Sequence, residues 1–312
     1  MVKILDISKW HTEISDVVTI GKRIKKVVYH PTSFREHYFK EPKEDFPWEF
    51  WTEVIASRIG LEFGFNVVQY DVAFSYESVG CFSKSMVKSD EMLVHGQQYL
   101  TGLKPDFEID KGLDHTFQLV EQFFKSRAIY DGMIHEFIEM LVFDAIIGNR
   151  DRHQQNWAII QPNSYIKPKG EMMRYTEFVK NQTKPRFSPI FDNGNSLAYE
   201  ILEDKISNFL NNSVTCDKYL FGKKATAHVR WNGLCIPHIE LIREISKLYP
   251  DTVKNVVQRV RERREKINIK AIVQSIDDGI IFADIKFSLT DNRKELITFL
   301  LEKRLERLLD SF

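Results

Sequence analysis

The first part of the chain carries short apolar runs rich in valine, tyrosine and phenylalanine, separated by polar residues. These residue types favour β-strands, because branched and aromatic side chains pack well on a pleated surface. The pattern predicts strands at residues 26–29, 38–40, 67–74 and 80–83. One helix is expected among them, beginning at Pro47, which suits a first helical position, and ending near Gly60. Its apolar residues recur at helical spacing, namely Trp48, Trp51, Ile55 and Ile59.

From about residue 91 onward the apolar positions recur mostly at helical spacing. Charged amphipathic helices are expected at residues 240–248, 251–268 and 293–309. Residues 133–147 are almost wholly apolar, which predicts a buried helix, and Gly148 suits its C-terminal cap. The pattern therefore predicts an α+β fold with two lobes. The first is a small β-rich lobe at residues 1–90, and the second is a larger, mostly helical lobe at residues 91–312.

A polar loop follows the apolar helix. Residues 148–156 read Gly-Asn-Arg-Asp-Arg-His-Gln-Gln-Asn and place Asp151 five positions before Asn156. A short apolar run follows at 157–160, and a second run, at 187–191, leads directly into Asp192 of an Asp-Asn-Gly segment. Two short strands after a buried helix would bring these three polar side chains to one place.

Such side chains meet the needs of kinase-type phosphoryl transfer. That reaction uses a carboxylate beside the attacking hydroxyl, and an Asn with a second Asp to hold magnesium. The Asp-to-Asn spacing is that of the protein-kinase catalytic loop, and Asp-x-Gly resembles the kinase metal-binding motif, although here the His follows the Asp. Asn, Asp, Arg and Gly also crowd into ordinary turns. The buried helix before the loop and the apolar run before Asp192 favour the catalytic interpretation.

The composition permits an enzyme without pointing to one. The chain has 312 residues, of which 43% are hydrophobic and 28% charged, as in ordinary globular proteins. Lys plus Arg and Asp plus Glu both number 44, which gives no footprint for nucleic-acid binding. The three cysteines are scattered, as expected in a reducing compartment. The charged N-terminus is unlike a secretory signal, and no apolar run reaches the ~18 residues of a membrane span. A cytoplasmic location where the protein is made, without membrane insertion, is therefore expected.

The chain resembles the HipA-like serine/threonine kinases. The resemblance extends from residue 30 to about residue 200 and is carried by segments 38–42, 50–60, 80–85, 148–156 and 191–194. It implies a two-lobed kinase that uses ATP and magnesium and phosphorylates a Ser or Thr of a protein substrate. It also extends to bacterial effectors that are delivered to a host cell, so action in the protein's own cell and export to a host both stay open.

Within the polar loop and the Asp-Asn-Gly segment, the resemblance assigns three roles. Asp151 would be the catalytic base. Asn156 and Asp192 would hold the metal ion.

In the β-rich part, the resemblance implies that Lys40 meets the nucleotide phosphates and that Glu53, on the following helix, orients Lys40. Periodicity does not single out Glu53, because Glu49 and Glu53 share a helix face and both could be exposed to solvent. The connector at Met86 and Val87 would face the adenine.

Two phosphate-binding motifs of other nucleotide enzymes are absent from the sequence. The chain has neither the Gly-x-Gly-x-x-Gly loop of protein kinases nor a Walker A motif, which argues against a P-loop NTPase. Residues 30–36 are expected to cover the phosphates instead, with backbone N–H groups and the hydroxyls of Thr32 and Ser33 as donors. A plain hairpin turn is the alternative. An insertion at residues 161–186 is either an ordinary surface loop or a substrate-facing one.

The sequence thus predicts an ATP- and magnesium-dependent Ser/Thr protein kinase that can phosphorylate itself. Two alternatives stay open. A phosphoinositide kinase fits Asp-Arg-His-x-x-Asn equally well, but the chain lacks an evident basic, aromatic face for docking on a membrane. A pseudokinase or interaction module that binds nucleotide without turnover is the other alternative, and the complete set of expected site residues disfavours it.

Overall fold

A six-stranded sheet forms the first part of the molecule. The computed structural model describes residues 2–13, 25–76, 78–162, 184–222 and 225–312. The strand order is β1-β5-β6-β4-β3-β2, with β1 parallel to β5 and every other pair antiparallel. The strands are β1 (Ile4–Asp6), β2 (His11–Glu13), β3 (Lys25–Tyr29), β4 (Glu36–Lys40), β5 (Tyr70–Ser75) and β6 (Ser78–Lys84). The four predicted strands are confirmed, although the strand expected at 67–74 begins only at Tyr70, and β1 and β2 were not predicted.

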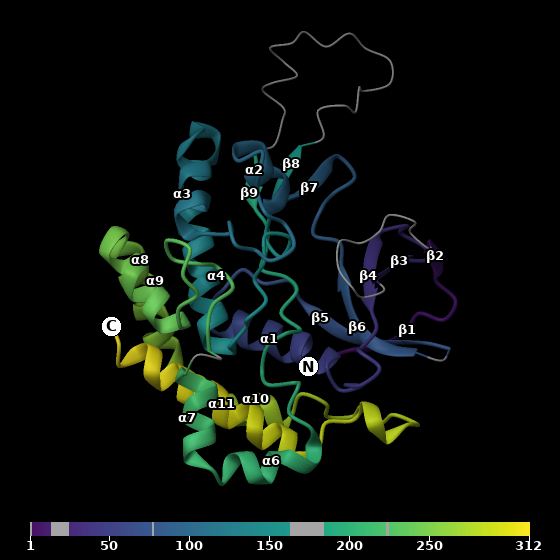
Figure 1. Ribbon diagram of the computed structural model, residues 1–312. Coiled ribbons are helices and arrows are strands. Elements are labelled where there is room, and N and C mark those ends of the chain that lie inside the picture. Colours follow the sequence, from purple (N-terminus) through teal and green to yellow (C-terminus); the bar gives the residue numbers. More distant parts are fainter. Residues whose placement is uncertain (1, 14–24, 77, 163–183, 223–224) are drawn as a thin grey trace, which may run out of the picture.

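Helix α1 (Phe50–Glu62) lies between this sheet and the helical part of the molecule (Figure 1). Its expected start at Pro47 is wrong, because residues 43–49 form a turn in which the Glu49 N–H donates to the Phe46 carbonyl, and the helix begins only at Phe50. The sequence left open whether Glu49 and Glu53 are exposed, and the structure shows that both are buried. The helix is covered on nearly all sides, so its charged residues do not mark a face that is exposed to solvent.

A second, antiparallel sheet has the order β7-β8-β9. It consists of β7 (Glu91–His95), β8 (Ala158–Pro162) and β9 (Arg186–Phe187). Strand β8 was predicted, but β7 lies where the sequence predicted the helical part to begin. The expected strand at 187–191 is shorter than predicted: after β9 the chain turns, and Ile190 pairs instead with Val67 beside the first sheet. Asp192 therefore follows a bridge between two distant segments.

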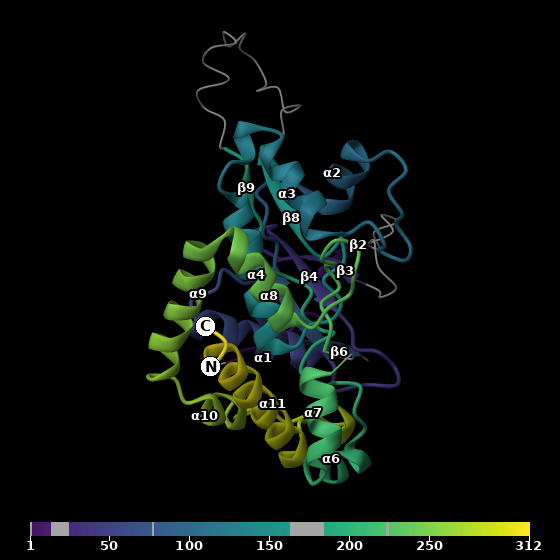
Figure 2. The same ribbon diagram turned by 60° about the vertical axis from the view of Figure 1, so that its left-hand side comes forward.

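Helix α4 (Met133–Ile147) has the predicted bounds, and Gly148 ends it in the left-handed conformation, with φ 68°. Helix α4 is the centre of the helical part and packs against α3, α8, α9, α11 and β9. In both views the three-stranded sheet lies at one end of the helical part, and α6 and α7 lie at the other (Figure 1, Figure 2). The remaining helices are α2 (Gly96–Leu103), α3 (Phe117–Lys125), α6 (Glu203–Leu210), α7 (Ser213–Phe221), α8 (His238–Leu248), α9 (Pro250–Arg264), α10 (Ile269–Gln274) and α11 (Asp291–Leu309), with short 3-10 turns at Ala128–Tyr130 and Ile285–Phe287.

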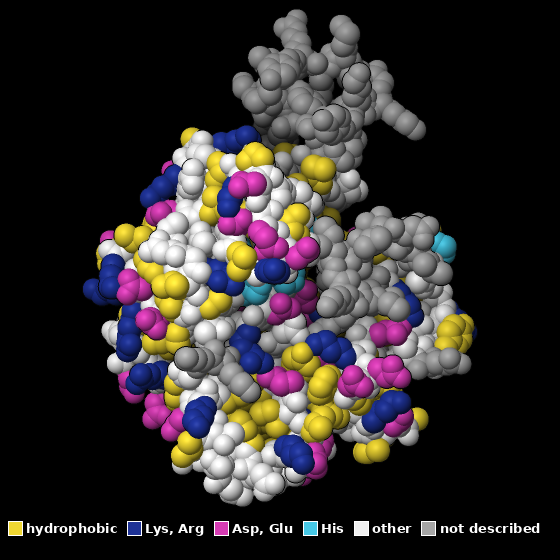
Figure 3. Space-filling view, in the orientation of Figure 1, with side chains coloured by type: hydrophobic (Ala, Val, Ile, Leu, Met, Phe, Trp, Pro, Cys, Tyr) yellow, Lys and Arg dark blue, Asp and Glu magenta, His cyan; other side chains and the backbone are white. Residues whose placement is uncertain are grey.

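The predicted α+β class is confirmed, and one main core runs through both parts. None of the helices in the described ranges is long and apolar enough to cross a bilayer. Positive and negative side chains are interspersed over the face shown in Figure 3. Of the predicted insertion at 161–186, residues 163–183 lie outside the described residues.

Candidate active site

Lys40, at the end of β4, lies between two carboxylates. Its Nζ is 2.5 Å from Oε1 of Glu53, on α1, and 2.5 Å from Oδ1 of Asp192. The neighbouring strand β6 passes very close to β4 at Gly80. Only glycine fits at this position, because a Cβ there would lie 2.2 Å from the Lys40 carbonyl oxygen. The structure thus brings together three residues that lie up to 152 positions apart in the sequence.

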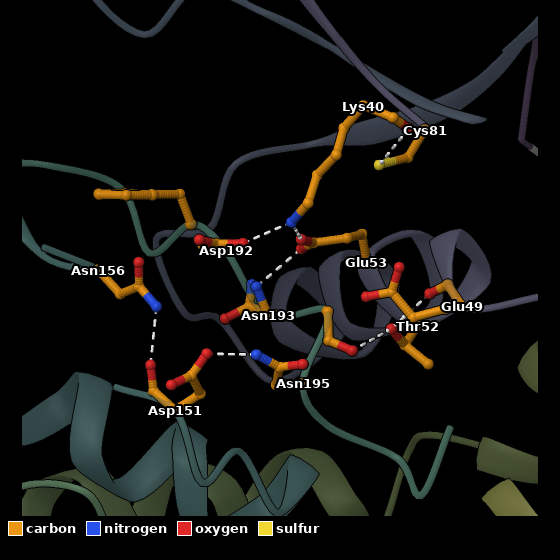
Figure 4. A network of polar contacts seen from close by, with 12 residues as sticks. Lys40, Glu49, Thr52, Glu53, Cys81, Asp151, Asn156, Asp192, Asn193 and Asn195 are labelled. Carbon is orange, nitrogen blue, oxygen red and sulfur yellow. Dashed lines mark hydrogen bonds and ion pairs between the residues drawn. The ribbon is translucent and has the colours of Figure 1, made fainter. Parts of the chain in front are cut away.

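Glu53 connects the lysine with the segment after Phe191. Its side chain is fully buried, and its second oxygen, Oε2, accepts a hydrogen bond of 2.8 Å from the Asn193 N–H (Figure 4). Asp192 itself has a left-handed backbone, with φ 57°. Asp and Asn tolerate this conformation better than most residues, since their short polar side chains bond locally. The local sequence Asp-Asn-Gly therefore suits the turn that directs the Asp192 carboxylate toward Lys40.

Asp151 and Asn156 come from the loop that follows α4. The Asp151 N–H donates to Oδ1 of Asn149 at 3.0 Å, and the Asn156 amide group donates to the Asp151 carbonyl oxygen at 2.7 Å. Because the amide nitrogen of Asn156 is used in this way, its amide oxygen points away from Asp151 (Figure 4). The loop thus presents one carboxylate, from Asp151, and one amide oxygen, from Asn156.

Asn195 is a site residue that the sequence did not reveal. Its amide nitrogen donates to Oδ2 of Asp151, and its Oδ1 accepts a hydrogen bond of 3.1 Å from Nζ of Lys43. The Lys43 ammonium also lies over the Tyr199 ring, 4.2 Å from the ring centroid. Asn195 therefore fixes the side chain of Asp151 from the segment that carries Asp192. Its position three residues after Asp192 was the available signal.

Arg152 binds the loop from the interior of the protein. Its guanidinium makes two hydrogen bonds to the Asp144 carboxylate, at 2.7 and 2.9 Å. It also donates to the carbonyl oxygens of Asn156 and Phe191 and to the side-chain oxygen of Asn193, at 2.6–2.7 Å. One buried side chain thus joins α4, the Asp151 loop and the Asp192 segment. The signal in the sequence was Asp144, a carboxylate within the otherwise apolar stretch before the loop.

The charge state of this pair follows from its surroundings. Burial lowers the pKa of Arg152, but the charge and hydrogen bonds of Asp144 outweigh burial, so the pKa of Arg152 lies above its ordinary value. Burial raises the pKa of Asp144, and Arg152 opposes that rise. A guanidinium bound on two sides to a carboxylate is a strong, charge-assisted pair, and both groups are almost fully buried. Arg152 is therefore a permanent cation inside the protein.

The loop at residues 30–36 is present between β3 and β4, but its expected donors are already used. The backbone N–H groups of Thr32 and Ser33 lie 3.4 and 3.3 Å from Nδ1 of His30. Ser33 is exposed in this loop. A phosphate at this place would have to replace the His30 ring as the acceptor for these two N–H groups.

Met86 and Val87 lie in the segment that joins the two sheets, after β6 and before β7. Met86 packs against the main core, and the Val87 carbonyl accepts a hydrogen bond from the Ser85 hydroxyl at 3.3 Å. The structure thus places both residues in the connector where the sequence predicted them. Their expected contact with adenine stays a prediction.

The oxygen atoms of this site fit magnesium. Magnesium is usually bound by one or two carboxylates together with substrate phosphates and water, rather than by a cage of protein ligands. Asp192 offers a partly exposed carboxylate, and Asn156 offers an amide oxygen that points away from Asp151. Among the described residues no group of three or more His, Cys, Asp and Glu side chains could hold a metal, which is compatible with such an open arrangement.

Together, the fold and this site define a protein with the HipA-like kinase fold. The resemblance seen in the sequence is confirmed at the level of the fold by two solved structures. The crystal structure of the Helicobacter pylori proinflammatory kinase CtkA matches with a TM-score of 0.77 and 15% identity, over 99% of this chain and 96% of that one. HipA of Shewanella oneidensis MR-1, in its complex with HipB and operator DNA, matches with a TM-score of 0.57 and 14% identity, over 93% of this chain and 64% of that one.

Sequence comparison points in the same direction over a shorter length. The chain is 28% identical over 199 residues to a protein of Sinorhizobium fredii named "Putative kinase Y4dM". The match covers 62% of this chain and 40% of that protein, so the chain spans well under half of the relative's length. No family model matches the chain.

Proposed function

We propose that the chain is an ATP- and magnesium-dependent kinase that phosphorylates a Ser or Thr hydroxyl of a protein. The observation that carries this proposal is the position of Lys40, 2.5 Å from Glu53 and from Asp192. Strand lysine, helix glutamate and metal-binding aspartate are the three groups that protein kinases bring together around the phosphates of ATP. The names of the relatives CtkA and Y4dM support a kinase.

Each residue then has a defined task. Asp151, held by Asn195, orients the acceptor hydroxyl and accepts its proton as the oxygen attacks. Lys40 binds phosphate oxygens, and Glu53 keeps its ammonium in place. Asp192 and Asn156 would hold magnesium, which would supply positive charge beside the transferred phosphoryl group. Such positioning and electrostatic stabilisation supply most of the catalysis in phosphoryl transfer.

The proposal divides the chain into a nucleotide-binding lobe at residues 1–90 and a catalytic lobe at residues 91–312. It places Ser33 near the phosphates and the connector at Met86 and Val87 near the adenine. The first assignment requires the phosphate to replace the His30 ring as the acceptor of the two loop N–H groups. The protein phosphorylates itself on a hydroxyl in the turns of the small lobe, where Thr32 and Ser33 are exposed.

One experiment separates the candidate functions. The purified protein is incubated with labelled ATP and magnesium in three reactions: alone, with a generic protein acceptor, and with phosphoinositide vesicles. We expect label on protein, in phosphoserine or phosphothreonine, and none with Asp151→Asn. Label on lipid alone would replace the protein substrate by a phosphoinositide. Absence of label in all three reactions, with ATP still bound, would contradict catalysis.

A further inference from the structure

A cavity lies beside the start of the Asp151 loop. It has a volume of about 180 Å³ and is lined by residues from the end of α4 and from α7, α8 and α11. Its lining includes Arg150, Tyr219, His238 and Arg304. Nucleotide and drug-sized ligands occupy pockets of about 300–1,000 Å³, so this cavity fits a smaller ligand.

Arg304, on α11, is a buried cation whose charge is not balanced by an ion pair. Its exposed fraction is 7%, and within the described ranges no carboxylate forms an ion pair with it. Its contacts are a long hydrogen bond of 3.5 Å to the Ile147 carbonyl, a side-chain hydrogen bond with Tyr219, and the Tyr219 ring, 5.7 Å from the guanidinium carbon. The Glu200 carboxylate lies near enough to favour the charged form of Arg304 but does not pair with it. Gly148 makes room for it, since a Cβ there would lie 2.2 Å from that carbon. A buried, unpaired charge is costly unless an anion neutralises it.

His238, the first residue of α8, faces the same cavity. It is 7% exposed, its ring bonds the backbone of Asn149, and its Nε2 has no hydrogen-bond partner among the described residues. Burial, together with the nearby charges of Arg304 and Arg150, lowers the pKa of His238 to about 3. The ring is therefore neutral, and its Nε2 offers a lone pair to a donor in the cavity.

The start of α8 adds further donors. Ile239 and Glu240 line the cavity, and no side chain caps this helix end. The His238 N–H already donates to the Ala225 carbonyl, so the donors offered to the cavity are the N–H groups of Ile239 and Glu240. The first N–H groups of a helix lack partners within the helix and carry partial positive charge, so they bind anions. Three further arginines line the cavity against the single carboxylate of Glu240: Arg150, Arg243 and Arg307. Of these, Arg150 pairs with Glu200, and Arg243 donates to the Ser311 hydroxyl at 3.0 Å.

We propose that this cavity binds a phosphoryl group in its singly protonated form, either as inorganic phosphate or as a small phosphate monoester. The anionic oxygens accept hydrogen bonds from Arg304, from the other arginines and from the α8 amides. The remaining P–OH donates to Nε2 of His238. Sulfate has the same shape but carries no proton near neutral pH, so it leaves Nε2 without a donor.

The cavity shares residues with the Asp151 loop. Arg150 precedes Asp151 in the chain, and Asn149 binds the Asp151 N–H with its side chain and the His238 ring with its backbone. An anion in the cavity therefore restrains Arg150 and, through it, the loop that carries Asp151. Binding at this place does not depend on the proposed kinase activity, although it would regulate such an activity.

Titration calorimetry with inorganic phosphate, O-phosphoserine and sulfate tests the proposal. We expect one saturable site. The affinity for O-phosphoserine should rise as the pH falls toward about 6, where phosphate monoesters take up a proton. Inorganic phosphate already carries one proton at neutral pH, so its affinity should not rise in this way. Sulfate should bind at least about tenfold more weakly. Tighter binding of phosphoserine than of phosphate would identify an ester as the ligand, and the reverse would identify free phosphate.

Variants place the binding in this cavity. Arg307→Gln should weaken phosphate binding about tenfold, and because Arg307 is exposed the variant should fold. Arg304→Gln should abolish binding. Lys303→Gln removes an exposed charge from the same helix and should leave the phosphate affinity unchanged. Failure of phosphate to saturate, equal binding of sulfate, or unchanged affinity in Arg307→Gln would each overturn the proposal.

Discussion

Arg152 donates a hydrogen bond of 2.6 Å to the carbonyl oxygen of Phe191, the residue before Asp192. The two residues are 39 positions apart, and Arg152 itself follows Asp151 directly. One side chain thus connects the loop that carries Asp151 with the segment that carries Asp192. Loss of this contact would move the Asp192 carboxylate relative to Asp151, the proposed base.

The first prediction concerns this contact. Arg152→Ala should lower the free energy of unfolding by about 3–5 kcal/mol, because it leaves the Asp144 carboxylate buried without its partner. Urea unfolding measures the loss. The matched control is Arg259→Ala, which breaks a partly exposed pair with Glu139 and should cost less than about 1 kcal/mol. Equal losses in the two variants would show that the buried pair stabilises the fold no more than the partly exposed pair does.

Asp192→Asn should reduce turnover by about 10²-fold or more while the fold survives. The substitution removes a charged magnesium ligand, but Asn tolerates the left-handed backbone at this position as well as Asp does. Kinase rate and melting temperature on the purified variant check both statements. Turnover near that of the unchanged protein would refute the assignment of Asp192 to the metal.

Asp151→Ala and Lys40→Ala should differ in nucleotide binding. Asp151 acts on the acceptor hydroxyl, so its loss should reduce transfer by about 10²–10⁴-fold and leave ATP affinity nearly unchanged. Lys40 contacts the phosphates, so its loss should weaken both. Titration calorimetry with ATP and magnesium distinguishes the two variants, and equal loss of ATP affinity would mean that the roles are divided wrongly.

Self-phosphorylation should add mass on addition of ATP and magnesium. The candidate hydroxyls are those of the small-lobe turns, namely Thr32, Ser33, Ser75 and Ser78. A phosphate carries about −1.5 to −2 charges at neutral pH, so it would draw in neighbouring cations such as Arg35 and Lys84. Intact-mass spectrometry detects the product, with Asp151→Ala as the control. An unchanged mass, under conditions where a protein acceptor is labelled, would rule out self-phosphorylation and leave the kinase proposal standing.

The pair between Glu91 and Arg186 joins β7 to β9 and should make stability depend on pH. Two hydrogen bonds, of 2.6 and 2.8 Å, from Arg186 lower the pKa of Glu91 from 4.5 to about 2. The pair therefore stabilises the fold above about pH 4.5, and this contribution is lost as the pH falls toward 2.

Glu91→Gln should accordingly cost about 1 kcal/mol at neutral pH, a small value because Arg186 is partly exposed. The cost should shrink as the pH falls toward 2. Unfolding free energies from pH 7 to pH 3 measure the trend, with Glu306→Gln at an exposed pair as the control. A cost that stays constant over this range would refute the pKa assignment.

The sequence predicted what depends on local pattern and on motif spacing. Helix α4 and the left-handed Gly148 follow from an apolar run that ends in glycine. Asp151, Asn156, Asp192, Lys40 and Glu53 were all named from the sequence, and the structure brings the last three into direct contact.

What the sequence did not predict depends on contacts between distant segments. Strand β7 forms because β8 lies beside it, and a five-residue run gives no sign of a partner that follows more than 60 positions later. The same holds for Asn195, one of many polar loop residues until the fold places it against Asp151. The burial of Glu49 and Glu53 likewise depends on segments from elsewhere in the chain that pack against α1.

The ion pair between Lys40 and Asp192 has a thermodynamic consequence for the proposed kinase. In the protein alone, Asp192 already neutralises the ammonium that the nucleotide phosphates would use, and the lysine occupies the carboxylate that the metal would use. A metal ion that takes up Asp192 releases Lys40 for the phosphates, and phosphates that take up Lys40 release Asp192 for the metal. Magnesium and nucleotide should therefore each raise the affinity of the protein for the other by the same factor, so that neither binds well without its companion.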